Sequence, residues 1–239
     1  MKYYNWDLSN KCTAITTTRE LGNMAFQVGN DIDNVNKNRD ELSSLLSIDR
    51  KNIVFVHQTH SDVIQEVTSK DLGKGMNDFT SGVEADALYT KEKGIALGIF
   101  HADCVPIFFI DETIPLVGII HAGHIGTLKH IAYKAISKVI NKEHLNPNNI
   151  KVFIGPLRRK KSYLVNELEE ENIIKNGCKE ALDNHHFDVY QSNYLDLLKS
   201  DVRKENIIDS KIDTYLDENC FSAYKKTPIG RMASLIILK

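Results

Sequence analysis

Hydrophobic residues in this chain fall into short runs that alternate with polar stretches. Runs of strand length, rich in Ile, Val, Phe or Thr, occupy residues 12–18, 53–56, 95–100, 105–110, 116–120, 152–154 and 233–238. Such runs are typical of buried β-strands. Three of them follow one another between residues 95 and 120, and we expect these three to form the buried centre of a sheet.

Apolar residues at helical spacing predict the helices. Residues 126–140 repeat apolar side chains at i, i+3, i+4 and i+7, which is the clearest helical pattern in the chain. A second helix is expected over 33–46, with Asp33 as its N-cap, and further helices over much of 167–182 and 194–204. The mixture of strands and helices indicates an α/β or α+β protein.

Length and composition favour one domain. The chain has 239 residues, of which 42% are hydrophobic and 26% charged, and this is enough to bury a sizeable core. It contains no internal repeat, low-complexity tract or Pro/Gly-rich linker. We therefore predict a single domain over residues 1–239.

The charge balance argues against two classes of partner. The formal net charge is −2, so the sequence favours neither a nucleic acid nor an anionic membrane as a partner. No apolar run approaches the roughly 20 residues of a membrane span, and the first residues lack the apolar core of a signal peptide. These features predict a cytoplasmic protein.

Cysteine usage limits the thiol chemistry. The four cysteines, Cys12, Cys104, Cys178 and Cys220, are too few for a disulfide scaffold in a chain of this length, and none forms a CxxC pair. An all-cysteine zinc site is therefore not expected. Any cysteine chemistry should depend on one thiol with histidine partners.

Three candidate residues, His60, Cys104 and His121, lie at the edges of apolar runs. Burying such groups unpaired costs about 1–3 kcal/mol each, so their places at strand ends mark a candidate site. Two imidazoles and a thiolate suit Zn²⁺ and leave a fourth position open for water or substrate. Without metal, the same residues suit a thiolate nucleophile with histidine bases, and Cys104 taken alone suits a small core residue.

The order of motifs resembles the YfiH family, also called the multicopper polyphenol oxidase or laccase-domain family and described as purine nucleoside phosphorylases. The similarity extends nearly from end to end. The matching segments are Gly29-Asn30-Asp31 with Asn38-Arg39, His57-Gln58-Thr59-His60, Ala85-Asp86-Ala87, Ala102-Asp103-Cys104-Val105-Pro106, His121-Ala122-Gly123, Ile154-Gly155-Pro156, Phe221-Ser222-Ala223-Tyr224-Lys225-Lys226 and Gly230-Arg231.

The resemblance implies a fold and an activity. It implies one α/β domain of layered mixed sheets with flanking helices, related to cysteine-hydrolase-like folds. It also implies phosphorolysis of adenosine, inosine, guanosine or methylthioadenosine, with adenosine deaminase activity in the same pocket. The family's metal ligands correspond to His60, Cys104 and His121, with zinc as the expected ion. Copper is less expected, because one Cys and two His alone supply neither a blue-copper nor a trinuclear site.

Four further residues are expected to bind substrate, each with a structural alternative. Arg39 contacts phosphate or pairs with a carboxylate such as Asp31. Asp86 and Asp103 bind substrate, orient a ligand histidine or remain structural carboxylates. Arg231 donates to phosphate or is an ordinary surface residue.

The chain also departs from the family pattern. His124 and Ile125 replace the family's Trp-Arg pair, which removes one expected phosphate donor and offers His124 as a further metal ligand. Lys225-Lys226 replaces an Arg pair, and point charges substitute for bidentate donors. These changes leave open a non-catalytic nucleoside-binding protein, beside the alternative of a metal-independent cysteine hydrolase.

The remaining polar segments are assigned structural roles. His57 is expected to support its loop, and His101 to pack in the core. Residues 158–161 form a solvated basic loop, and the polar, Gly-containing stretch 68–84 is expected to be mobile and able to cover a site.

Overall fold

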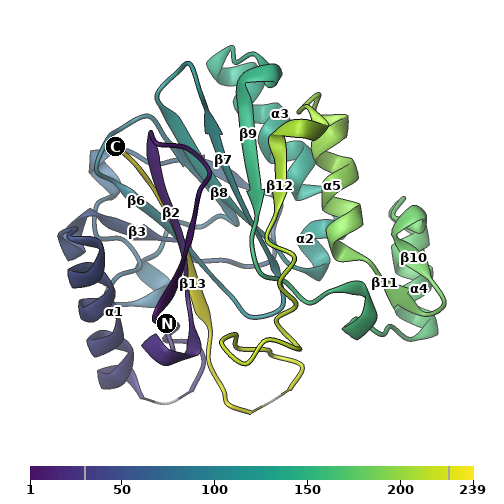
Figure 1. Cartoon of the computed structure of the whole chain (residues 1–239), viewed down its shortest axis with the longest axis horizontal. Coiled ribbons are helices and arrows are strands. Elements are labelled where there is room, and N and C mark those ends of the chain that lie inside the picture. Colours follow the sequence, from purple (N-terminus) through teal and green to yellow (C-terminus); the bar gives the residue numbers. More distant parts are fainter. Residues whose placement is uncertain (30, 226) are drawn as a thin grey trace.

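Two mixed β-sheets packed face to face form the centre of the computed structural model, which describes residues 1–29, 31–225 and 227–239 (Figure 1). The five-stranded sheet has the order β1 (Tyr3–Trp6), β2 (Cys12–Thr17), β13 (Met232–Leu238), β6 (Ala96–His101) and β3 (Ile53–Phe55). The six-stranded sheet has the order β12 (Ile207–Asp209), β9 (Ile150–Ile154), β7 (Val105–Asp111), β8 (Leu116–Ala122), β5 (Ala87–Thr90) and β4 (Ile64–Glu66).

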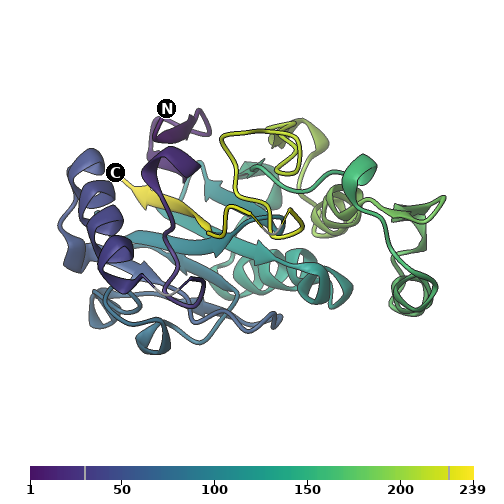
Figure 2. The same ribbon diagram turned by 90° about the horizontal axis from the view of Figure 1, so that it is seen from below.

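Helices cover the two outer faces of this sandwich. Helix α1 (Ile32–Leu46) packs on the five-stranded sheet, while α3 (Ile131–Glu143) and α5 (Val189–Lys199) pack on the six-stranded sheet. The short α2 (His124–Leu128) precedes α3. Figure 2 shows α4 (Glu167–Lys175) and the hairpin of β10 (Leu182–Asp183) and β11 (His186–Phe187) projecting from one end of the molecule.

The four layers explain the continuous apolar runs. Every residue of β7 is buried, because the strand has a helix layer on one face and a sheet on the other. Its alternate residues separate accordingly: Ile107 and Phe109 pack toward α3, and Phe108 and Ile110 pack between the sheets. The prediction of a mixed α/β architecture is confirmed, although the first of the three central runs lies in a different sheet from the other two.

The predicted helix over 126–140 is in fact two helices. His130 has a left-handed backbone (φ 58°) between α2 and α3, and its ring nitrogens lie 2.8 Å from both Asp196 Oδ1 and the Asn176 carbonyl. These contacts with α5 and the end of α4 hold the break. Periodicity could not reveal it, because the apolar spacing continues across the break.

Other boundaries also differ from the prediction. Asp31, not Asp33, caps α1 by accepting from the Asn34 amide at 3.0 Å. Helix α5 begins at Val189, before the predicted 194, because Asp188 accepts the Gln191 amide as its N-cap. Short strands such as β4 and β12 were not predicted; each has only three residues and carries little pattern.

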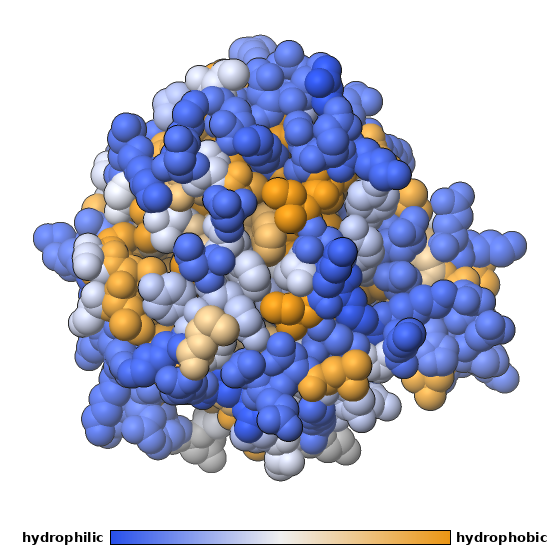
Figure 3. Space-filling model, in the orientation of Figure 1, coloured by the Kyte–Doolittle hydropathy of each residue, from blue (hydrophilic) through white to orange (hydrophobic). Residues whose placement is uncertain are grey.

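The face seen in Figure 3 is largely hydrophilic, with hydrophobic residues showing mainly in the hollows between polar ones. None of the helices that the structure describes is long and apolar enough to cross a membrane.

A close ring–backbone contact in the sheet yields a first prediction. On β8, a Cβ added at Gly118 would overlap the ring of Phe109, its partner on β7. We expect Gly118→Ala to lower the free energy of unfolding by about 1–3 kcal/mol, as overpacked cores do. Urea denaturation measures this change. Adding Phe109→Leu should restore part of the loss, and purely additive losses would contradict the contact.

Candidate active site

The candidate site lies where the chain crosses from one sheet to the other. Strand β6 ends at His101, residues Ala102–Cys104 cross over, and β7 begins at Val105 in the second sheet. His121, near the end of β8, pairs with Pro106 of β7. His60 reaches the same point from the loop after β3. The ends of strands from both sheets thus meet at one place.

These ends enclose a cavity of about 400 Å³. It brings together all three residues of the predicted metal set with two of the predicted substrate residues, Asp103 and Arg231. Its walls are formed by Gln27, Val28, Gln58, His60, Phe79, Phe100, His101, Ala102, Asp103, Cys104, His121, Ala223 and Arg231.

The imidazoles and the thiol are close neighbours in this cavity. The rings of His60 and His121 lie edge to face, with centroids 5.1 Å apart, and Cys104 lies near enough to the His121 ring for its charge to raise the pKa of that ring. Gly123 is essential to this closeness: a Cβ there would overlap His60 Nδ1 and come within 3.2 Å of Cys104 Sγ. The His-Ala-Gly motif therefore contributes the His121 side chain to the site, and its glycine leaves the space that the His60 ring needs.

Asp86 holds the site from behind. Its fully buried carboxylate lies 2.9 Å from His121 Nδ1 and accepts the backbone N–H groups of Thr59, His60 and Ser61. The Ser61 hydroxyl donates to the same carboxylate at 2.7 Å. Asp86 is outside the cavity lining, so it positions the histidines rather than contacting what enters.

The electrostatics distinguish the two histidines. Burial alone would lower the pKa of His121, but the charge of Cys104 and the hydrogen bond to Asp86 raise it to about 9. Burial, with the neighbouring His121, lowers the pKa of His60. For Asp86, burial opposes ionisation, but the His121 and Ser61 contacts outweigh it and lower the pKa.

Two imidazoles and a thiol are donor types that suit a soft divalent ion. The positions of these side chains, however, do not form a coordination sphere. No group of three His, Cys, Asp or Glu residues in the described ranges is arranged to hold a metal ion. Even so, His60 Nδ1 is buried without a hydrogen-bond partner, and Asp86 fixes the ring orientation of His121. Carboxylate-oriented imidazoles of this kind are typical of metal ligands.

Asp103 and Arg231 play different parts in the cavity wall. The carboxylate of Asp103 accepts the Thr214 hydroxyl at 2.8 Å and the Tyr224 amide at 2.9 Å, and so ties the C-terminal loop to the site. Arg231 forms no ion pair within the described residues; its Nη1 donates only to the adjacent Gly230 carbonyl. Its guanidinium is thus the group best placed to meet an anion.

Arg39 is not brought to the cavity. Its side chain is fully buried under α1, donates to the carbonyls of Met24, Gly75 and Met76, and stacks on the Phe26 ring at 4.0 Å. Neither phosphate contact nor the alternative pairing with Asp31 describes it. These bonds also hold residues 75 and 76, so the loop 68–84, expected to be mobile, is anchored. The same loop was expected to be able to cover a site, and its Phe79 lines the cavity.

Three other histidines lie around the site. His57 packs against the Phe79 ring. His101 is buried in the cavity wall and hydrogen-bonds Ser234 at 2.7 Å. His124 turns away from the metal candidates toward Tyr163, whose hydroxyl lies 3.3 Å from its Nδ1. Asn30 and Lys226, which belong to two of the family motifs, lie outside the described residues.

The basic run 158–161 is only partly the solvated loop that the sequence predicted: Lys160 and Lys161 reach solvent, whereas the two arginines are largely covered. Arg158 is buried between the rings of Tyr163 and Tyr224, at 4.2 and 3.8 Å, and Arg159 pairs with Asp209. Tyr224 and Asp209, two of these partners, are far away in sequence, and the charge pattern alone gives no sign of them.

Sequence analysis missed several cavity residues, including Gln27, Val28 and Ala223. Gln58 belongs to a recognised motif, but its task is structural: its amide hydrogen-bonds both the N–H and the C=O of Phe100. The motif identified Gln58, but it could not show that Phe100 is the hydrogen-bond partner.

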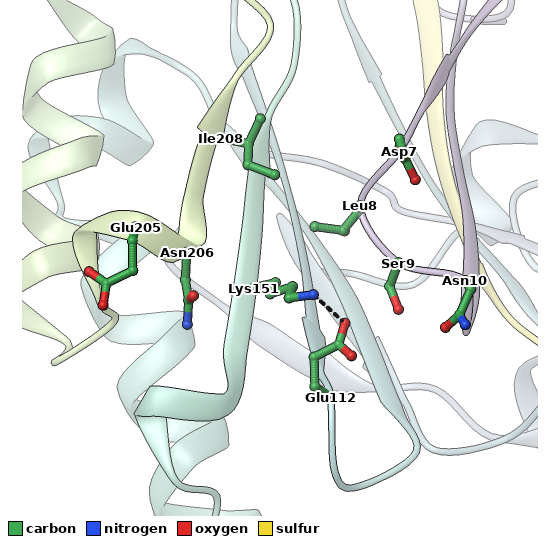
Figure 4. A pocket seen from close by; sticks show the side chains of 9 residues that line it. All are labelled: Asp7, Leu8, Ser9, Asn10, Glu112, Lys151, Glu205, Asn206 and Ile208. Atoms are coloured by element: carbon green, nitrogen blue, oxygen red, sulfur yellow. Dashed lines mark ion pairs between the residues drawn. The ribbon is translucent and has the colours of Figure 1, made fainter.

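A second cavity, of about 490 Å³, lies away from these residues (Figure 4). It contains an ion pair of Lys151 and Glu112 at 3.2 Å. None of the predicted site residues lines it; its walls are Asp7, Leu8, Ser9, Asn10, Glu112, Lys151, Glu205, Asn206 and Ile208.

Comparisons with known proteins agree on one family. The model of the family described as "Multi-copper polyphenol oxidoreductase laccase" matches residues 14–239. The purine nucleoside phosphorylase YlmD of Bacillus subtilis is 32% identical over 215 residues, covering 85% of this chain and 77% of that protein. The protein of the same name from Geobacillus stearothermophilus is 32% identical over 225 residues, covering 90% and 82%.

Two solved structures share the complete fold. The Bacillus licheniformis hypothetical protein YfiH has a TM-score of 0.93 at 28% identity, covering 100% of this chain and 97% of that one. YlmD from Geobacillus stearothermophilus has a TM-score of 0.93 at 30% identity, with the same coverage. The layered α/β arrangement predicted from the motifs is therefore confirmed.

The role of Asp86 gives a second prediction. Asp86→Asn replaces one acceptor oxygen by a donor that faces N–H groups, so we expect the free energy of unfolding to fall by about 2–4 kcal/mol. Urea denaturation measures it. Asp62→Asn is the matched control, because the partly exposed Asp62–Lys134 pair should contribute less than about 1 kcal/mol. Equal losses in the two variants would contradict the assigned role.

Proposed function

Since this chain belongs to the multi-copper polyphenol oxidoreductase laccase family, as its motifs indicated, we propose that it acts as a purine nucleoside phosphorylase. Relatives that carry this name are 32% identical over most of the chain. The observation that carries the proposal is the convergence of His60, Cys104, His121 and Arg231 on one cavity.

The cavity suits a nucleoside and an anion together. Its volume of about 400 Å³ falls within the range of small-molecule sites, and Val28 and Phe79 give it an apolar part suited to a planar base. Arg231 supplies a cation without a carboxylate partner among the described residues. Adenosine, inosine, guanosine and methylthioadenosine are the proposed nucleosides, with phosphate as the second substrate.

In this proposal the residues position the reactants for substitution at the ribose. Arg231 holds phosphate so that its oxygen attacks C1′ as the bond to the purine breaks. His121, kept in one orientation by Asp86, and His60 bracket the ribose end of the cavity. Because the strand ends fix these side chains, little reorganisation is needed when substrate enters.

Zinc is the proposed cofactor, and His60, Cys104 and His121 are the residues that would hold it. A bound zinc ion supplies Lewis-acid chemistry and lowers the pKa of water, which adenosine deamination requires. We include this deaminase activity in the proposal. The family's description names copper, but a single thiol with two imidazoles lacks the further ligands of a multicopper centre.

A metal-independent cysteine hydrolase is the second candidate. One observation favours it: Asp86 hydrogen-bonds the His121 ring and Cys104 lies beside that ring, which is the order acid, base and nucleophile. In that case Cys104 would attack an amide or ester carbonyl and form a thioester as the amine or alcohol leaves with a proton, and water would then hydrolyse the thioester.

The third prediction tests these two candidates. We expect the purified protein to release hypoxanthine from inosine only with phosphate, and Cys104→Ala to lower this activity by at least about 100-fold. Cys12→Ala is the control, since Cys12 is buried in β2 outside the cavity. Full activity of Cys104→Ala would refute the site. A zinc-free protein that is inactivated by iodoacetamide and cleaves esters would favour the hydrolase.

The fourth prediction concerns phosphate. Arg231→Gln removes the cavity's cation, so we expect the KM for phosphate to rise by about 10- to 100-fold while the KM for inosine changes little. Steady-state kinetics at varied phosphate measures this. Arg159→Gln should leave both constants unchanged, because Arg159 pairs with Asp209 outside the cavity. An unaltered phosphate KM in Arg231→Gln would remove Arg231 from the proposal.

A further inference from the structure

His101 is a buried histidine in the cavity wall whose two ring nitrogens have unequal surroundings. It ends β6, is 1% exposed and lines the cavity. Its Nε2 lies 2.7 Å from Ser234 Oγ, while its Nδ1 is buried without a hydrogen-bond partner among the described residues. An unpaired buried nitrogen costs about 1–3 kcal/mol, so a fold that retains one beside a cavity calls for an explanation.

A chain of hydrogen bonds leads away from Nε2 between the two sheets. Ser234 Oγ lies 2.7 Å from Thr16 Oγ1, which in turn accepts the Trp6 indole N–H at 3.0 Å. Indole can only donate, so it fixes one end of the chain. If Thr16 donates to Ser234, and Ser234 to His101 Nε2, every hydroxyl proton has an acceptor.

The opposite direction leaves more polar groups unpaired. If His101 Nε2–H donated to Ser234, then Ser234 would donate to Thr16, whose own proton would have no acceptor within the described part of the chain. That arrangement also leaves the lone pair of His101 Nδ1 without a donor, whereas the first leaves only the Nδ1 proton unpaired. The count of donors and acceptors therefore favours a ring that accepts at Nε2 and carries its proton on Nδ1.

The ring is also neutral. Burial lowers the pKa of His101 to about 3, and the nearby charges of His121 and Arg231 act in the same direction. Neutral imidazole is a hydrogen-bond donor that does not lose its proton near pH 7, which suits a group that must polarise a substrate atom without transferring a proton to it.

We propose that His101 Nδ1–H is the donor that stabilises the departing purine base, accepted by a base atom such as N7. This inference rests on the proposed phosphorylase function. It deepens that function by naming the group that assists the leaving base. The crossover Ala102–Cys104 follows His101 directly and lines the same cavity, so the proposal places the purine base against this turn.

The step balances as follows. A phosphate oxygen forms a bond to C1′ while the C1′–N9 bond breaks, and the electron pair of that bond goes to the purine. Negative charge grows on the base, and the Nδ1–H hydrogen bond strengthens as it does. His101 keeps its proton. The proton of the attacking hydrogen phosphate passes to solvent, and the base takes one from solvent.

Two substitutions separate the two nitrogens. In His101→Gln the amide can reach Ser234 as Nε2 does, but no donor remains at the Nδ1 position. In His101→Asn the amide nitrogen lies near the Nδ1 position, but the Ser234 contact is lost. We expect His101→Gln to lower kcat for inosine by about 10- to 100-fold with little change in KM, and His101→Asn to remain within a few-fold of wild type.

A substrate that needs no donor distinguishes this role from a structural one. p-Nitrophenyl β-D-ribofuranoside releases a stable phenolate, so its phosphorolysis should be nearly equal in His101→Gln and wild type. Equal losses on both substrates, or no loss on inosine, would overturn the inference while leaving the phosphorylase function intact.

The ring tautomer supplies an independent readout. ¹⁵N NMR of the histidine-labelled protein should place the His101 proton on Nδ1, and a proton on Nε2 would overturn the inference whatever the kinetics show. Wild-type protein that does not phosphorolyse inosine would instead overturn the proposed function, and with it the role of His101 in that reaction.

Discussion

The candidate site depends on one buried carboxylate and the donors that surround it. Asp86 directly precedes β5 and is shielded from water. An unpaired charge in such a buried position would be strongly unfavourable. It is tolerated because three backbone amides, a hydroxyl and the His121 ring donate to it. These donors come from the loop after β3 and from β8. The need to satisfy one charge therefore brings distant segments to one place.

The contact with Asp86 also explains why the pKa values of His101 and His121 are shifted in opposite directions. His121 meets an anion on one side and a thiol on the other, and its pKa rises to about 9. His101 has no anionic partner, and burial, together with the neighbouring cations, lowers its pKa to about 3. Both rings are buried, and burial lowers the pKa of each; only His121 has anionic partners that outweigh this effect.

Sequence reasoning performed best where the physics is local. Apolar runs predicted the strands of the central layers, because a strand buried on both faces shows a continuous signal. The motifs indicated His60, Cys104 and His121 together, and the structure brings them to one cavity.

Long-range pairing marks the limit of that reasoning. Arg39 and Arg231 both stood in recognisable motifs, yet one donates to three backbone carbonyls under α1 and the other faces the cavity. Arg158 looked solvated because Tyr224, one of the two rings that enclose its guanidinium, belongs to the distant C-terminal loop. In each case the sequence showed the charged residue, but its contacts depend on groups that only folding brings near.

The site is held in shape by the fold itself. His60 has a left-handed backbone (φ 58°), an unfavourable conformation for a residue with a side chain, and the bond of its amide to Asp86 helps to maintain it. Gly123 leaves the space that the His60 ring occupies. The strained backbone of His60 and the absent side chain of Gly123 do not stabilise the core. Both serve to bring the His60 ring beside Cys104. A segment that was free to relax would lose this strained arrangement. That the fold retains it is the strongest structural reason to regard this cavity, rather than the larger one beside Lys151, as the place where the protein acts.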